Sequence, residues 1–246
     1  MTESRPTLVE GARRWLEAGP REGPVRQALT DFVEGRYRGH APAVKRVHDK
    51  RAGLLSDHRP LIELGPAARG PWDDGTVALA AEHSAPPDQG RLLFHLTRAF
   101  RPGRVIELGT NIGVSAAYLA TGLAANAAGH LTTLEASGLR LLLARDLLGK
   151  LGLTGLVTTV EGYFDDTLPE VLAGDRFDMA FVDGNHTEEA TVRYFDLLVD
   201  HSSPDAVLVF DDIRWSEGMS RAWATLSARP VARICVDLGR TGIILL

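Results

Sequence analysis

The stretch RVIELGTNIGVS, residues 104–115, decides the fold. Its first five residues suit a short apolar strand, and Gly109 and Gly113 mark a turn after that strand. Residues 114–120 then have the composition of a helix. Glycines let a backbone approach a ligand closely, and the start of a helix offers free N–H groups. A strand, a glycine turn and a helix in this order predict a site for a nucleotide-like ligand.

Downstream of this stretch, short apolar segments alternate strictly with segments of helical periodicity. The expected strands are 104–108, 130–134, 156–160, 177–182 and 206–210, and the expected helices are 113–127, 137–149, 167–173, 188–199 and 216–228. Such alternation predicts an α/β protein with a parallel sheet and helices on both faces. The last two strands, 231–236 and 241–246, are joined by four residues, which is too short for a crossover, so they must form an antiparallel hairpin.

The first hundred residues have a less regular, mainly helical pattern. Helices are expected near 8–16, 25–37, 42–55, 74–83 and 89–100. The segment PLIELG at 60–65 repeats part of the later glycine stretch, but the prolines at 66 and 71 cannot open the same helix, so we interpret the repeat as chance or a short loop-strand. We therefore expect an N-terminal helical extension at 1–86 and a sheet domain at 87–246.

Composition excludes several classes of function. The net charge of -5 argues against nucleic-acid binding, because such binding needs a concentrated basic face. The basic residues between 45 and 51 fit the solvated face of a helix. Cys235 is the single cysteine, so an internal disulfide and a thiolate metal cluster are excluded. The polar N-terminus does not resemble a signal peptide and no apolar run is long enough to span a bilayer, so we expect a cytoplasmic protein without membrane contact.

Acidic residues fall at the carboxyl ends of four of the expected strands. They are Glu107, Glu135, Asp183 and Asp211. Ligands of open α/β sheets bind along that edge. Glu135 follows the glycine turn at close to the ~20-residue separation at which an acid reaches ribose hydroxyls; the alternative is a helix-terminal acid. Asn111 stands where a dinucleotide motif has its second glycine, which disfavours a pyrophosphate and favours a smaller adenosine ligand with an amino-acid tail.

These motifs together resemble the class I, Rossmann-like S-adenosylmethionine-dependent methyltransferases. The resemblance is carried by residues 105–109 with Gly113 and Ser115, and by 133–135, 177–186 and 209–212. It is most similar to the branch of cation-dependent small-molecule and sugar O-methyltransferases. It implies a doubly wound, mostly parallel seven-stranded sheet of order 3-2-1-4-5-7-6 with the last strand antiparallel. The N-terminal extension resembles the helical lids of such enzymes, which could also join two copies into a homodimer.

The resemblance implies a set of cofactor-binding residues for S-adenosylmethionine. The turn from 109 to 113 would wrap the methionine part, Glu135 would hold the ribose, and segment 161–164 would lie against the adenine. Tyr163 stands where many relatives have Asp, so the adenine contact differs here. The full implied set is Glu107, Gly109, Thr110, Asn111, Gly113, Ser115, Glu135, Ala136, Gly162, Tyr163 and Asp183.

A second site is expected at the ends of the neighbouring fourth and fifth strands. The carboxylates of Asp183, Asp211 and Asp212 should converge there, and oxygen ligands suit Mg²⁺ or another divalent cation. The alternative is that Asp211 and Asp212 cap a helix or bind substrate directly. His186, with Asp183, is the candidate catalytic group, because an imidazole can accept a proton near neutral pH; the alternative is a helix cap. Trp215 would line the acceptor pocket or pack in the core.

The sequence therefore predicts methyl transfer from S-adenosylmethionine to a hydroxyl oxygen of a small molecule, assisted by a divalent cation. Three alternatives remain open: N- or C-methylation without a metal, a non-catalytic cofactor-binding or scaffold protein, and a NAD-dependent oxidoreductase. The last of these is disfavoured by Asn111 and by the terminal hairpin. The identity of the acceptor cannot be read from the sequence, because its pocket would be built largely by residues 1–100.

Overall fold

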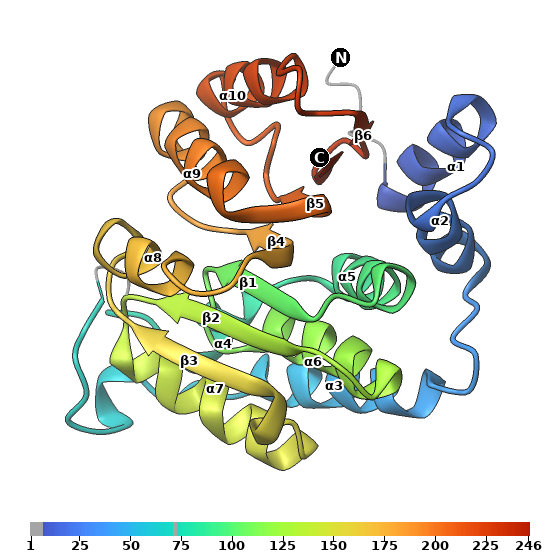
Figure 1. Cartoon of the computed structure of the whole chain (residues 1–246). Helices are drawn as coiled ribbons and strands as arrows, with labels where there is room; N and C mark the ends of the chain where they lie inside the picture. Colours follow the sequence, from blue (N-terminus) through green and yellow to red (C-terminus); the bar gives the residue numbers. More distant parts are fainter. Residues whose placement is uncertain (1–6, 71–72) are drawn as a thin grey trace, which may run out of the picture.

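The computed structural model describes residues 7–70 and 73–246 and contains one mixed sheet of order β3-β2-β1-β4-β5-β7-β6 (Figure 1). Its strands are β1 (Arg104–Leu108), β2 (His130–Glu135), β3 (Val157–Glu161), β4 (Phe177–Val182), β5 (Ser202–Phe210), β6 (Ile234–Asp237) and β7 (Gly242–Leu245). Strands β1 to β5 pair in parallel, while β7 runs antiparallel to both β5 and β6. The predicted fold class is confirmed, including the strand order and the terminal hairpin.

The helices occupy both sides of this sheet. They are α1 (Leu8–Ala18), α2 (Pro24–Glu34), α3 (Ala41–Leu54), α4 (Val77–Glu82), α5 (Pro87–Phe100), α6 (Val114–Asn126), α7 (Gly138–Leu151), α8 (Phe164–Leu172), α9 (Glu188–His201) and α10 (Glu217–Ser227). Each predicted helix is found, with ends shifted by a few residues. Within the described ranges no helix combines the length and apolar character needed to cross a membrane.

Alternating strand residues bury the two faces of the sheet in separate hydrophobic clusters. Val105 of β1 packs in a cluster with residues of α1, α2, α5 and α6. Its neighbour Ile106 points the other way and packs with residues of α8, α9 and α10. This follows from the two-residue period of a strand. Figure 1 shows the resulting layers, with α8 and α9 on one side of the sheet and α5 and α6 on the other.

The N-terminal helices pack directly onto these layers. Leu8 of α1 and Leu29 of α2 are buried in the same cluster as Val105. Helices α3 and α4 share a third cluster with α6 and α7. The segment that repeats the glycine motif forms a short 3-10 helix, Leu61–Glu63, and Pro60 makes an isolated bridge to Thr76. It therefore does not contribute a strand to the sheet, which fits its interpretation as a chance repeat.

The register of three central strands sets the position of the functional residues. Leu108 is paired with Val182, and Val182 with Phe210. The amide of Asp183 donates to the carbonyl of Leu108 at 2.8 Å, and the amide of Asp211 donates to that of Val182 at 2.9 Å. The residues that follow β1, β4 and β5 consequently lie side by side at one edge of the sheet. Strand β5 begins at residue 202, earlier than predicted, because its first residues still pair with β4 across an irregularity in the register.

Candidate functional site

The glycine turn after β1 forms a tightly packed floor. Gly109 has φ of +105°, and a Cβ there would lie 1.9 Å from the carbonyl oxygen of Asp183. Gly113, at the start of α6, has φ of +84°, and a Cβ there would lie 2.9 Å from Ala144. Left-handed backbone of this kind favours glycine. The two glycines therefore hold the turn against β4 on one side and α7 on the other.

A cavity of about 640 Å³ opens above this floor. Of the predicted cofactor residues, it is lined by Gly109, Asn111, Ser115, Glu135, Ala136, Tyr163 and Asp183. The other four predicted residues, Glu107, Thr110, Gly113 and Gly162, do not line it. Its size falls within the roughly 300–1,000 Å³ range of small-molecule sites. The sequence reasoning missed the contribution of the segment before α5, where His83, Ser84 and Ala85 close the cavity.

Glu135 is fixed by two backbone amides, one from the glycine turn and one from the start of α7. Its Oε2 atom accepts a hydrogen bond from the amide of Asn111 at 2.8 Å, and its Oε1 atom accepts one from the amide of Ser137 at 3.0 Å. A carboxylate oxygen can accept a second hydrogen bond. Each carboxylate oxygen of Glu135 can therefore accept a further hydrogen bond from a hydroxyl group of a ligand.

Glu107 lies beneath the turn and is fully buried. Its Oε2 atom accepts a hydrogen bond from the hydroxyl of Thr133 at 2.5 Å, and that hydroxyl lies 2.5 Å from the hydroxyl of Thr110. Burial raises the pKa of Glu107 to about 7, against the opposing effect of hydrogen bonds from Thr133 and Ser115. Glu107 and Thr110 thus support the turn from below, and their side chains do not reach the cavity.

An unpredicted ion pair ties the N-terminal extension to the glycine turn. Asp73 is only 2% exposed. It accepts hydrogen bonds from Nε of Arg140 at 3.0 Å and from the hydroxyl of Ser137 at 2.5 Å. Arg140 also donates to the side-chain oxygen of Asn111 at 3.1 Å. The sequence gives no signal for this pair, because Asp73 lies in a loop without periodicity and its partners are distant in the chain.

A larger cavity of about 910 Å³ adjoins the first. It is lined by residues from the start of α1, from the segment between residue 61 and the start of α5, from α7, from the loops after β4 and β5 and from the terminal hairpin: Thr7, Leu8, Leu61, Gly75, Thr76, Leu79, Ala80, Glu82, His83, Pro86, Asp88, Arg140, Asp183, His186, Asp212, Trp215 and Arg240. Both cavities include Asp183 and His186 among their walls. The two spaces therefore meet at these residues. Trp215 is 66% exposed at the rim of the larger cavity, so it is not a core residue.

His186 stands at this junction among carboxylates. Its Nε2 atom lies 3.5 Å from Oδ1 of Asp183 and 3.9 Å from Oδ2 of Asp212. Burial alone would lower the pKa of His186, but the hydrogen bond to Asp183 and the negative charges of the aspartates outweigh it, so the pKa is raised. Burial and the charge of Asp211 raise the pKa of Asp183 to about 6. A histidine in these surroundings can receive a proton from a ligand in the larger cavity.

Around the three aspartates of the predicted metal site, the structure shows an arginine in contact with two of the carboxylates. Asp211 is fully buried, and Arg240 donates to both of its carboxylate oxygens, from Nε at 3.1 Å and from Nη2 at 2.7 Å. Nε of Arg240 also lies 3.1 Å from Oδ1 of Asp212. Among residues 7–70 and 73–246, no group of three or more His, Cys, Asp or Glu side chains is arranged to hold a metal ion. The sequence reasoning placed Arg240 only in the hairpin turn and so missed this cation.

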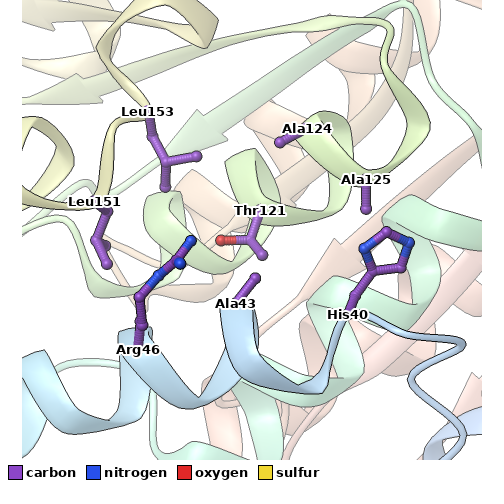
Figure 2. A pocket seen from close by; sticks show the side chains of 8 residues that line it. All are labelled: His40, Ala43, Arg46, Thr121, Ala124, Ala125, Leu151 and Leu153. Atoms are coloured by element: carbon purple, nitrogen blue, oxygen red, sulfur yellow. The ribbon is translucent and has the colours of Figure 1, made fainter.

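A third, smaller cavity lies between α3 and the C-terminal parts of α6 and α7. Figure 2 shows its walls, with His40, Ala43 and Arg46 on one side and Thr121 among the residues on the other. Its volume is about 210 Å³. The hydroxyl of Thr121 already donates to the carbonyl of Ala117 within α6. None of the predicted site residues lines this cavity, so it is separate from the candidate functional site.

Residues 106–213 match the model of a family described as a methyltransferase domain. A catechol O-methyltransferase from Mycobacterium tuberculosis is 36% identical over 125 residues, which cover 51% of this chain and 54% of that protein. The chain spans about half the length of the curated relatives it matches.

Two solved structures show the same fold. The O-methyltransferase TomG from Streptomyces achromogenes, in complex with SAM, superposes with a TM-score of 0.57 at 27% identity, covering 66% of this chain and 81% of TomG. An O-methyltransferase from Bacillus cereus, in complex with SAH, superposes with a TM-score of 0.60 at 22% identity, covering 89% of this chain and 96% of that protein. The resemblance to class I S-adenosylmethionine-dependent methyltransferases, drawn from the strand-end motifs, is thereby confirmed.

Proposed function

We propose that this chain, which resembles class I methyltransferases in its matched domain and its sheet order, transfers the methyl group of S-adenosylmethionine to a hydroxyl oxygen of a small molecule. The observation that carries the proposal is the meeting of two cavities at Asp183 and His186. One cavity lies over the glycine turn, and the other is large enough for a separate acceptor. The O-methyltransferase names of the relatives support the same reaction.

The smaller cavity has the donor and acceptor groups that S-adenosylmethionine needs. Glu135 would accept the ribose hydroxyls, Gly109 and Asn111 would lie along the methionine part, and Tyr163 would border the adenine. Tyr163 is 60% exposed, so its ring is available to a ligand at the cavity mouth. When bound, S-adenosylmethionine supplies an electrophilic methyl group on a sulfonium.

His186 is the proposed general base. An acceptor hydroxyl in the larger cavity would give its proton to Nε2 of His186 as its oxygen becomes bonded to the methyl group and S-adenosylhomocysteine is left by cleavage of the methyl–sulfur bond. Asp183 and Asp212 then stabilise the positive charge on the imidazole, since both lie within 4 Å of it. Alignment of the two reactants across the junction can supply about 7–11 kcal/mol of the barrier reduction.

The walls of the larger cavity indicate an acceptor with an apolar body and a hydroxyl group. Leu8, Leu61, Leu79 and Trp215 contribute apolar surface, and His186 lies at the inner end. The N-terminal residues up to 86 would thus act as the acceptor-binding part of the protein, and the division at residue 87 remains a proposal. A small aromatic alcohol or phenol fits this description.

A divalent cation does not fit the carboxylate groups as they stand, so no step is derived through a metal. Both oxygens of Asp211 accept hydrogen bonds from Arg240, and Asp212 shares the same guanidinium. An oxygen-ligand site for Mg²⁺ would need these atoms. The divalent cation that the sequence predicts would therefore have to compete with Arg240 for the oxygens of Asp211 and Asp212.

The test combines calorimetry with S-adenosylhomocysteine and transfer of labelled methyl groups to a panel of phenols. We expect saturable binding of S-adenosylhomocysteine and methyl transfer to at least one phenol. The His186→Gln variant should lose roughly 100-fold or more in turnover, the usual contribution of a general base, while its affinity for S-adenosylhomocysteine stays within a few-fold. His58→Gln, at an exposed histidine that lines neither cavity, is the matched control. Absence of cofactor binding would contradict the proposal, and full activity of His186→Gln would contradict the base assignment.

A further inference from the structure

We propose that Arg240 is the resident cation of the acceptor site and makes methyl transfer by this protein independent of a divalent metal. The role of Arg240 in methyl transfer rests on the proposed function. The exclusion of a metal ion rests only on the arrangement of four side chains. These are the carboxylates of Asp183, Asp211 and Asp212 and the guanidinium of Arg240. The position that a metal would occupy between the carboxylates is taken by a group from the terminal hairpin.

The guanidinium binds Asp211 with the geometry that arginine forms with carboxylates. Two nitrogen atoms, Nε and Nη2, donate to the two oxygens of Asp211. Thr241 adds a hydrogen bond to Oδ1 of the same carboxylate at 3.3 Å. Such bidentate, charge-assisted pairs are among the strong hydrogen bonds of proteins. Asp211 is fully buried, so removing its partner would leave an uncompensated charge in the interior.

The backbone delivers Arg240 to this position. The carbonyl of Arg240 accepts a hydrogen bond from the amide of Ile213 at 3.0 Å, directly after the aspartate pair. Within the hairpin, the amide of Leu238 donates to the carbonyl of Thr241 at 3.0 Å. Gly239 has φ of +90°, which lets the turn close between them. The loop after β5 and the hairpin therefore hold each other, and the arginine is placed by the fold.

A metal ion and this guanidinium compete for the same oxygens. A divalent ion bridging the aspartates would need at least one oxygen of Asp211 or Asp212, and Arg240 contacts both residues. Displacement would break a bidentate pair around a buried carboxylate, and it would leave the arginine beside the metal with like charge. We therefore expect metal binding to be weak while Arg240 is present.

The same cation faces the acceptor. Arg240 lines the larger cavity, and its side chain is 41% exposed there. A fixed positive charge near an acceptor hydroxyl favours loss of its proton and stabilises the negative oxygen that forms. His186 would receive that proton, and the electron pair left on the oxygen would form the new bond to the methyl carbon as the methyl–sulfur bond breaks and S-adenosylhomocysteine leaves with the electron pair on sulfur. Arg240 thus supplies the electrostatic role that a divalent cation would otherwise have.

The experiment measures Mn²⁺ binding by electron paramagnetic resonance in the presence of S-adenosylhomocysteine, for the parent protein and for Arg240→Met. We expect no saturable Mn²⁺ site in the parent and one site per chain in Arg240→Met, where the three carboxylates are left without their cation. Arg214→Met is the matched control, because Arg214 is similarly exposed at 42% and pairs with Asp237 of the same hairpin without lining the cavity. It should behave like the parent.

Turnover supplies the second readout. Parent activity should be unchanged by EDTA, and Arg240→Met should lose roughly 100-fold, the usual effect of removing one stabilising donor, and regain part of it with Mn²⁺. Arg240→Lys keeps the positive charge, so it should bind no Mn²⁺ and retain most of the turnover, which gives a second test if Arg240→Met does not fold. A saturable Mn²⁺ site in the parent, or loss of parent activity in EDTA, would overturn the inference. Absence of S-adenosylhomocysteine binding would instead overturn the proposed function. In that case, Mn²⁺ binding by the parent and by Arg240→Met, compared without cofactor, would still test whether Arg240 excludes a metal ion.

Discussion

The two halves of the site are built in different ways. The floor of the proposed cofactor half is one continuous strand, turn and helix, residues 104–126, although its walls come from other segments. The acceptor half is assembled from the side chains of α1, the α4 region, the loops after β4 and β5, and the terminal hairpin. The first depends on backbone conformation, and the second depends on charges brought together from distant parts of the chain. The two halves should therefore fail in different ways when they are altered.

Gly109→Ala should have the largest effect, because it alters the backbone-built half at its tightest point. The new methyl group would lie 1.9 Å from the carbonyl oxygen of Asp183, and the residue would also keep φ of +105°. Together these effects should cost more than about 3 kcal/mol. We expect loss of S-adenosylhomocysteine binding in calorimetry and a large drop in unfolding temperature.

Gly155→Ala is the matched control, because a Cβ there meets no atom within 4 Å and its φ is not in the left-handed region. It should bind S-adenosylhomocysteine like the parent. If Gly109→Ala also bound S-adenosylhomocysteine normally, the glycine turn would not be a rigid floor of the smaller cavity. The contrast between the two halves would then be wrong.

This contrast explains which parts could be predicted from the sequence. Local patterns determine the cofactor half, so the strand, turn and helix at 104–126, and the acids Glu135 and Asp183, were predicted at the correct edge. The direction of Glu107 was not predicted, because a strand pattern alone does not show that its side chain turns beneath the floor. The acceptor half depends on long-range pairs. Neither Asp73 with Arg140 nor Asp211 with Arg240 has a spacing that a single sequence can reveal.

Asp73→Ala should break the connection between the two halves. Asp73 is buried and holds Arg140, which in turn donates to Asn111 in the glycine turn. Removing one partner of a buried ion pair typically costs about 3–5 kcal/mol. We expect a loss of about 3 kcal/mol in the urea-derived free energy of unfolding, together with weaker binding of S-adenosylhomocysteine.

The neighbouring residue Asp74 is exposed, so Asp74→Ala provides a control in the same loop. It should change neither stability nor cofactor affinity measurably. If Asp73→Ala and Asp74→Ala had the same stability and the same cofactor affinity, the loop would only cover the site. The two halves would then not be coupled through Asp73.

Glu107→Gln should stabilise the protein rather than destabilise it, and it tests whether charge also matters in the backbone-built half. Burial raises the pKa of Glu107 from its ordinary value of 4.5 to about 7. For an acid whose pKa is raised on folding, the stabilising contribution is complete below about pH 4.5 and is lost as the pH rises through about 7. The neutral glutamine avoids that loss. At about pH 8 the variant should therefore be more stable than the parent, by up to about 3 kcal/mol, and at about pH 5 the two should be nearly equal.

Urea unfolding at both pH values measures the difference, with Glu170→Gln on the exposed side of α8 as the control. A variant that is less stable than the parent at high pH would show that the Glu107 carboxylate is needed in its charged form, and that the cofactor half, like the acceptor half, is held by charge.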